Sequence, residues 1–179
     1  MDSFAIKHEF EKRLDELGLS YQARIDNSYL LGNTNRVEER VIVKLLSSGH
    51  VDQSSVGSQN GNKVQSIGVF KLKLSSSDSN TDFFVLGFTN ITYQRIDFVI
   101  IPTEELKRRQ VKKNRIFKES HSISIVFWIM DDIFLYECSS VGVEWEWYYL
   151  SQGLNGRMID GSFRDYSDFL NDWKRLMVK

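Results

Sequence analysis

The sequence predicts an α+β or α/β fold with a mixed central β-sheet, an N-terminal helix, a β meander and a C-terminal helix. Apolar residues recur at helical spacing near both ends of the chain, at 4–17 and 165–177. Two segments between them, 82–88 and 96–101, are apolar on both faces apart from Asp82 and Asp97, which is typical of central strands that are covered on both faces. A strand with alternating apolar and polar residues precedes them at 69–74.

The composition indicates a single globular domain that spans residues 1–179. Hydrophobic residues make up 41% of the chain and aromatic residues 13%, which is enough for one well-packed core. Cys138 is the only cysteine, so the chain cannot form an internal disulfide, and a reducing cytoplasm suits it. The sequence shows neither a secretory signal nor an apolar run of roughly 18 residues. We therefore expect a cytoplasmic protein that does not enter a membrane.

The N-terminal helix is predicted from one apolar face and one charged face. Glu9 and Arg13 have the spacing of a favourable ion pair on the charged face, and Gly18 is placed to end the helix. The apolar face consists of Ile6, Phe10, Leu14 and Leu17.

Three segments lie between this helix and the alternating strand. Residues 21–31 mix aromatic and β-branched residues with polar ones, which predicts one strand or two short ones. Residues 36–46 fit either a helix or a strand, and we favour a strand from Arg40 onward. Residues 47–66 are rich in Ser, Gly, Asn and Gln. A tract of this length inside a domain is typically functional or disordered, so the sequence predicts a flexible loop there.

A short helix is predicted after the second apolar strand, because Pro102 ends that strand. Thr103 is placed to cap the helix. Glu104 and Glu105 occupy its first turn, where negative charge suits the helix dipole.

The C-terminal third predicts a meander of three strands at 123–130, 133–138 and 143–150. Asp131 and Asp132 lie between the first two strands and suit a tight turn. The last predicted element is the helix at 165–177, whose apolar stripe consists of Tyr166, Phe169, Leu170, Trp173 and Leu176.

Lysines lie on one face of the alternating strand. Its core face consists of Phe70, Leu72 and Leu74, and its other face of Val69, Lys71 and Lys73. The strand is followed by D-F-F-V-L-G-F and by an I-I-P-T-E-E-L strand-to-helix junction. This order, over roughly 38–106, resembles the catalytic core of the PD-(D/E)xK restriction-endonuclease-like superfamily.

The resemblance implies a DNA endonuclease that hydrolyses phosphodiesters with Mg²⁺, as part of a microbial restriction or defence system. Lys71 or Lys73 would steady the attacking water. Asp52 would be the upstream catalytic acid and a metal ligand, with Asp82 as a second ligand.

The motif is incomplete in this chain. Val69 or Lys71 stands where the motif has its acid, so a metal site requires a carboxylate from elsewhere, for which Asp82 and Asp97 are the candidates. The alternative is that Lys71 and Lys73 form the solvent-facing side of an amphipathic strand. The protein would then be catalytically reduced.

The densest positive charge lies at 107–118, where seven of twelve residues are basic and none is acidic. These residues are Lys107, Arg108, Arg109, Lys112, Lys113, Arg115 and Lys118. Such a run predicts salt-sensitive contacts with nucleic-acid phosphates, and the alternative is a solvated helix end. Residues 131–172 carry nine acids and two basic residues, which suits a protein partner of positive charge.

Other constellations are less informative. The aromatic residues of 145–149 could stack on bases, although strand alternation favours a core row. The three histidines, His8, His50 and His121, lack metal-ligand spacing.

Two main hypotheses follow. The first is a DNA-interacting protein with a restriction-endonuclease-like core, which uses Mg²⁺ if it is active. The second is a non-enzymatic module for protein interaction or regulation. A third hypothesis is a homo-oligomer whose interface is the aromatic meander.

Overall fold

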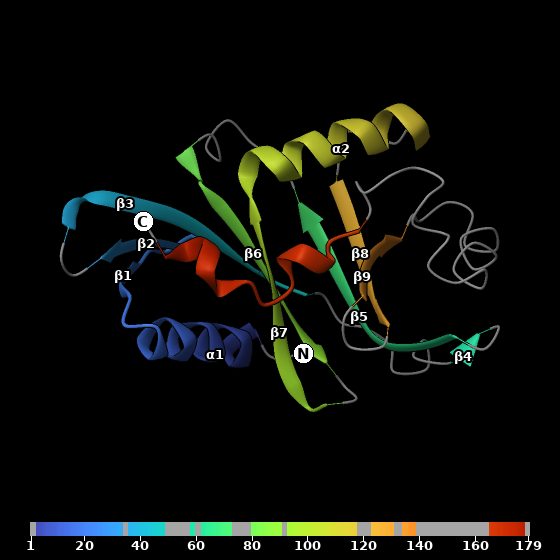
Figure 1. Cartoon of the computed structure of the whole chain (residues 1–179), viewed down its shortest axis with the longest axis horizontal. Coiled ribbons are helices and arrows are strands. Elements are labelled where there is room, and N and C mark those ends of the chain that lie inside the picture. The colour runs from blue at the N-terminus through green and yellow to red at the C-terminus, as the bar shows by residue number, and fades with distance from the viewer. Residues whose placement is uncertain are drawn as a thin grey trace.

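The structure is a computed structural model, and it describes residues 3–33, 36–48, 58–59, 62–72, 80–90, 93–117, 123–130, 134–138 and 165–177. It confirms an α+β fold with a mixed central sheet (Figure 1). The five-stranded sheet has the order β1-β2-β3-β6-β7, and its β3–β6 pair is parallel while the other pairs are antiparallel. Its strands are β1 (Ser20–Ala23), β2 (Ser28–Asn33), β3 (Arg36–Ser47), β6 (Phe83–Asn90) and β7 (Arg95–Pro102).

A second, antiparallel sheet has the order β4-β5-β8-β9. It consists of β4 (Ser58–Gln59), β5 (Asn62–Leu72), β8 (Ile123–Met130) and β9 (Phe134–Cys138). The lysine-bearing strand therefore pairs with β8 and not with a strand of the five-stranded sheet. Ser48 links the two sheets, because its backbone N–H donates to Gly87 O and its Oγ accepts from the backbone N–H of Val69.

Helix α1 (Ser3–Glu16) confirms the N-terminal prediction. Ile6, Phe10 and Leu14 are fully buried, and Arg13 Nε lies 3.1 Å from Glu9 Oε1. Gly18 ends the helix with a φ of 68°. The N–H of Gly18 donates to Asp15 O and that of Leu19 to Leu14 O, which is a Schellman arrangement that satisfies the last carbonyls.

Strands β6 and β7 are buried on both faces, as their apolar sequences predict. One face packs on α1 and on Leu176 of the C-terminal segment, and the other on α2 (Thr103–Phe117), β5 and β8. The core on the α1 side consists of Ile6, Phe10, Leu14, Tyr29, Leu31, Val43, Leu45, Val85, Phe98, Ile100 and Leu176. The core on the α2 side consists of Phe70, Phe84, Leu86, Phe88, Val99, Ile101, Leu106, Ile125, Phe127, Tyr166 and Phe169. The β6–β7 hairpin thus separates two cores.

Several predicted boundaries differ from the structure. Residues 21–31 form two strands, and β3 extends over the whole segment that fitted either a helix or a strand. β5 begins at Asn62, inside the segment predicted as a loop. β8 and β9 form the first two strands of the predicted meander. The expected third strand at 143–150 and the turn at 131–132 lie outside the described residues.

The C-terminal segment also differs from the single helix expected at 165–177. It has two short 3₁₀ helices, η5 (Ser167–Phe169) and η6 (Trp173–Leu176). Between them Asn171, with a φ of 51°, donates its N–H to Phe98 O at 2.7 Å, and its Oδ1 accepts the N–H of Phe98 at 2.9 Å. The outer edge of β7 would otherwise leave these groups without a partner, so pairing with the edge replaces the helix.

Gly87 is predicted to be essential for packing between α1 and the sheet. A Cβ atom there would overlap the side chain of Ile6 and lie 3.0 Å from the ring of Phe98. Gly87→Ala should therefore lower the free energy of unfolding, measured in urea, by about 1–3 kcal/mol. Gly32→Ala in β2 is the control, because the new Cβ would meet only Ser20 Oγ, at 3.3 Å. If Gly87→Ala and Gly32→Ala lowered the free energy of unfolding equally, this account of the packing would be contradicted.

Candidate nucleic-acid interface

The start of α2 is fixed by Asp82. Its carbonyl oxygen accepts the backbone N–H of Thr103 at 2.9 Å, and its carboxylate Oδ2 accepts the N–H of Ile42 at 2.7 Å. The predicted metal ligand Asp82 thus joins α2 to β3, through its backbone oxygen on α2 and one carboxylate oxygen on β3. Thr103 does not cap α2 with its side chain, because its buried Oγ1 has no hydrogen-bond partner in the part of the chain that the structure describes.

Acids in the first turn of α2 pair with the first three cations of the basic run. Lys107 Nζ lies 2.8 Å from Glu104 Oε1. Glu105 accepts hydrogen bonds from Arg108 and, at 2.6 Å, from Arg109. The Arg108 hydrogen bonds lower the pKa of Glu105 from its ordinary 4.5 to about 2, against the opposing effect of partial burial, and Arg109 adds to the lowering.

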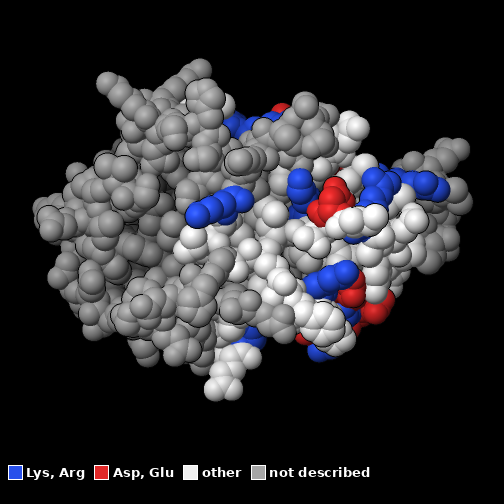
Figure 2. Space-filling view, turned by 180° about the vertical axis from the view of Figure 1, so that it is seen from behind, with Lys and Arg blue, Asp and Glu red and all other residues white. Residues whose placement is uncertain are grey.

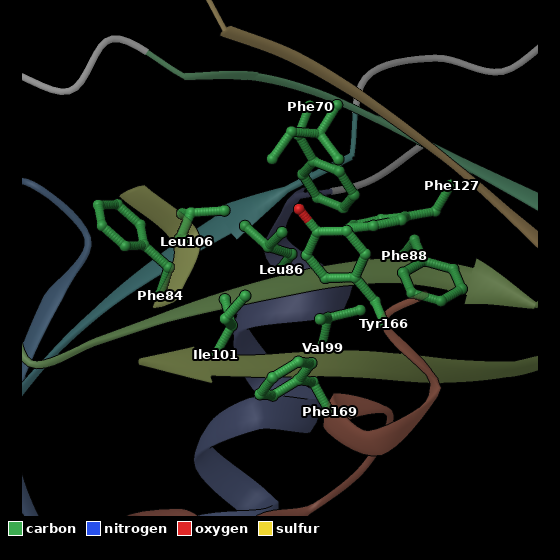
Figure 3. Packing of buried hydrophobic residues seen from close by; sticks show 11 residues of the cluster. Phe70, Phe84, Leu86, Phe88, Val99, Ile101, Leu106, Phe127, Tyr166 and Phe169 are labelled. Carbon is green, nitrogen blue, oxygen red and sulfur yellow. The ribbon is translucent and has the colours of Figure 1, made fainter. Parts of the chain in front are cut away.

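Arg109 is buried and belongs to the core. Only 6% of it is exposed, and its guanidinium donates to Asp165 O at 2.6 Å. The same group lies over the rings of Tyr166 and Phe169, at 4.6 and 4.9 Å from their centroids. Figure 3 shows the Tyr166 ring in the middle of the cluster that includes Leu86 and Phe127. Arg109 therefore binds the C-terminal segment to α2 and is not available to a phosphate.

The cations of α2 whose side chains are described as exposed or partly exposed form the α2 basic surface, which we define as Lys107, Arg108 and Lys112. Arg108 and Lys112 lie one helical turn apart, and Val111 beside them is 50% exposed. Lys112 has no ion pair with any residue in the described ranges. Two other predicted contacts, Lys113 and Arg115, lie on α2 in the part where side chains are not described, and Lys118 lies outside the described residues.

Charge elsewhere on the described surface is mixed. Figure 2 shows Lys and Arg atoms beside Asp and Glu atoms on the face opposite to that of Figure 1. On α1, for example, Lys12 lies 3.6 Å from Glu9 and 3.9 Å from Glu16. The excess of positive charge along α2 after its first turn, where residues 106–118 contain no acid, is therefore a local feature.

The predicted catalytic residues are only partly described. Lys71 is exposed on β5 opposite Ser124 of β8, while its neighbour Phe70 is buried, which confirms the predicted faces at these two positions. Lys73 and Asp52 lie outside the described residues. Within the described ranges, no group of three His, Cys, Asp or Glu residues could hold a metal ion.

Asp97, the other candidate carboxylate, is buried in a hydrogen-bond network. It accepts from Asn90 Nδ2 at 2.9 Å, from Arg95 Nε at 2.8 Å and from Asn171 Nδ2 at 2.9 Å. The carboxylate thereby joins the β6–β7 hairpin to the C-terminal segment. Sequence reasoning missed this role, because Asn171 lies 74 residues from Asp97.

The roles of Glu105 and Arg109 were also missed. Their spacing of four residues on a helix is a signal for an ion pair, but the burial of Arg109 depends on Tyr166 and Phe169. The aromatic residues at 145–149 and most of the acidic segment at 131–172 lie outside the described residues.

Comparisons of the chain with protein-family models, curated proteins and solved structures found no match. In the described part of the chain, neither helix has the length and apolar character needed to span a membrane.

Glu105 is predicted to stabilise the fold in a pH-dependent manner. Because its pKa is lowered on folding, the stabilisation is complete above about pH 4.5 and is lost as the pH falls toward about 2. Glu105→Gln should lower the free energy of unfolding by roughly 2–3 kcal/mol at pH 7. The difference from the wild type should shrink in urea titrations at pH 4 and pH 3.

Glu104→Gln is the matched control, because Glu104 pairs with Lys107 but is 86% exposed. It should change the stability by less than about 0.5 kcal/mol at every pH. A pH-independent loss in Glu105→Gln would show that the charge of Glu105 is not what stabilises the fold.

Proposed function

We propose that this protein binds nucleic acid through the α2 basic surface. The observation that carries the proposal is the division of the positive charge on α2. Arg109 is buried in the core, whereas Lys107, Arg108 and Lys112 are at least partly exposed on the same helix. The acids on α2, Glu104 and Glu105, lie in its first turn.

The physical basis is attraction to phosphates. Lys112 has no acidic partner in the described part of the chain, so a phosphate need not displace an existing ion pair there. Lys107 and Arg108 each have one acidic partner, and a phosphate would compete with it. Cations that contact phosphates release counterions from the nucleic acid, so the binding should weaken steeply with salt and depend little on base sequence.

The proposal is limited to binding. Mg²⁺-dependent cleavage would need a cluster of carboxylates, and the described ranges contain no group of three His, Cys, Asp or Glu residues that could hold the ion. Asp82 Oδ2 accepts the N–H of Ile42, and Asp97 accepts three side-chain donors. Cleavage by Asp52 with Lys71 or Lys73, and a role in a restriction or defence system, stay predictions from the resemblance.

Neutralising the α2 basic surface should weaken DNA binding. The variant Lys107→Gln, Arg108→Gln, Lys112→Gln is compared with the wild type by fluorescence anisotropy on a labelled duplex between 50 and 200 mM salt. The wild-type affinity should fall at least about tenfold over this range. The variant should bind about tenfold or more weakly at 50 mM salt, with a salt slope smaller by about 1 for each phosphate that the protein no longer neutralises.

The matched control is Lys7→Gln, Lys12→Gln, Arg13→Gln on α1, which removes the same charge from cations that also have acidic partners. This control should bind DNA like the wild type, after urea titration has shown that both variants are folded. Equal weakening in the two variants, or wild-type binding that does not depend on salt, would refute the proposal.

A further inference from the structure

Within the described part of the chain, no strand pairs with the outer edge of β1. Its neighbour β2 lies on one side, and at the opposite edge of the sheet β7 is covered by the C-terminal segment (Figure 1). Arg24 N–H donates to Ser28 O at 2.8 Å, so alternation in the antiparallel pair turns the N–H and C=O groups of Tyr21 and Ala23 away from β2. Neither residue has another backbone partner in the described ranges.

The side of the sheet that faces away from α1 is positively charged near this edge. Arg24 and Arg40 are exposed, and neither has an ion pair with a described residue. Gly32 has no side chain, and an open hollow of about 240 Å³ lies over the strands beside it. The hollow is lined by Ser20, Tyr21, Gln22, Leu30, Leu31, Gly32 and Arg40.

On the side of the sheet that faces α1, carboxylates lie near this edge. The pKa of Tyr21 is raised first by burial and then by the negative charges of Asp15 and Glu11. Asp15 is exposed and has no ion pair within the described part of the chain. An added strand would therefore meet cations on one of its faces and a carboxylate on the other.

An apolar side chain lies at the end of β1. Ile25 is fully exposed directly after Arg24, and it is the most exposed of the large hydrophobic residues that the structure describes. Its burial by a partner would favour association.

We propose that β1 accepts an extended peptide as an additional strand of the five-stranded sheet. The backbone of this peptide pairs with Tyr21 and Ala23. Its acidic side chains lie on the face of Arg24 and Arg40, and uncharged side chains lie on the face of Asp15. The alternation of an extended strand provides these two faces.

Charge favours an acidic peptide over a second copy of this chain. Two copies of β1, paired antiparallel about Gln22, would place Arg24 opposite Ser20 of the other copy and bring no acid to either arginine. Nucleic-acid phosphates could pair with Arg24 and Arg40, but they would not pair with the alternating N–H and C=O groups of Tyr21 and Ala23. The inference is independent of DNA binding by α2, since it uses none of the same residues.

The test uses two labelled eight-residue peptides of equal composition. One alternates Glu with Thr, so that all acids lie on one face of a strand, and the other repeats Glu-Glu-Thr-Thr, which puts acids on both faces. The alternating peptide should bind the full chain about fivefold or more tightly in fluorescence anisotropy. Equal binding, or no binding of either peptide, overturns the proposal.

Two sets of variants test the two parts of the proposal. Ala23→Pro removes an N–H that points away from β2 and leaves the hydrogen bonds to β2 intact. It should lower the affinity for the alternating peptide about tenfold, whereas the control Ala23→Val should leave this affinity unchanged. The double variant Arg24→Gln, Arg40→Gln should bind the alternating peptide more weakly, and this binding should depend less on salt. Peptide binding that survives Ala23→Pro overturns strand addition.

Other occupants give different results. A concentration-dependent dimer in sedimentation that Ala23→Pro converts to a monomer would assign this edge to a second copy and overturn the proposal. Loss of DNA binding in the Arg24→Gln, Arg40→Gln variant, with no loss in Ala23→Pro, would assign the face to nucleic acid and also overturn it.

Discussion

The burial of the β6–β7 hairpin on both faces is the constraint on which the rest of the structure depends. Alternation sends Phe84, Leu86 and Phe88 into the core on the α2 side, whereas Val85 faces the core on the α1 side. Each face requires its own cover. α1 with η6 covers one face, and α2 with the second sheet and η5 covers the other, so a single hairpin determines where almost every other described element packs.

The same constraint determines which charges of α2 are free. To cover its side of the hairpin, α2 buries Leu106 and, with it, the adjacent guanidinium of Arg109. A buried cation is tolerated only if it is paired, and Glu105, Asp165 O and two aromatic rings pair with Arg109. The cations on the outer side of the helix are left for solvent or for a ligand. A stabilising role and a binding role thus belong to different residues of one basic run.

The spacing of apolar residues along each segment predicted much of this fold, because this spacing depends on which faces of that segment are buried. The 3.6-residue period predicted α1, and the apolar residues on both faces of 82–88 and 96–101 predicted strands covered on both faces. Contacts between distant residues could not be predicted in this way. Asn171 pairs with Phe98, and the segment predicted as one helix forms two 3₁₀ helices instead. Arg109, predicted as a phosphate contact, lies over the rings of Tyr166 and Phe169 and is a core residue. Periodicity carries no information about such partners.

The division of roles on α2 is tested most directly by Arg109→Lys, which keeps the positive charge but loses the planar guanidinium that pairs with Glu105 and lies over the aromatic rings. Two quantities are measured on this one variant, the free energy of unfolding in urea and the affinity for duplex DNA at fixed salt. The free energy of unfolding should fall by about 1–3 kcal/mol, while the DNA affinity of the folded protein stays within about twofold of the wild type. Unchanged stability together with an affinity reduced about tenfold would contradict the account, because Arg109 would then be a binding residue.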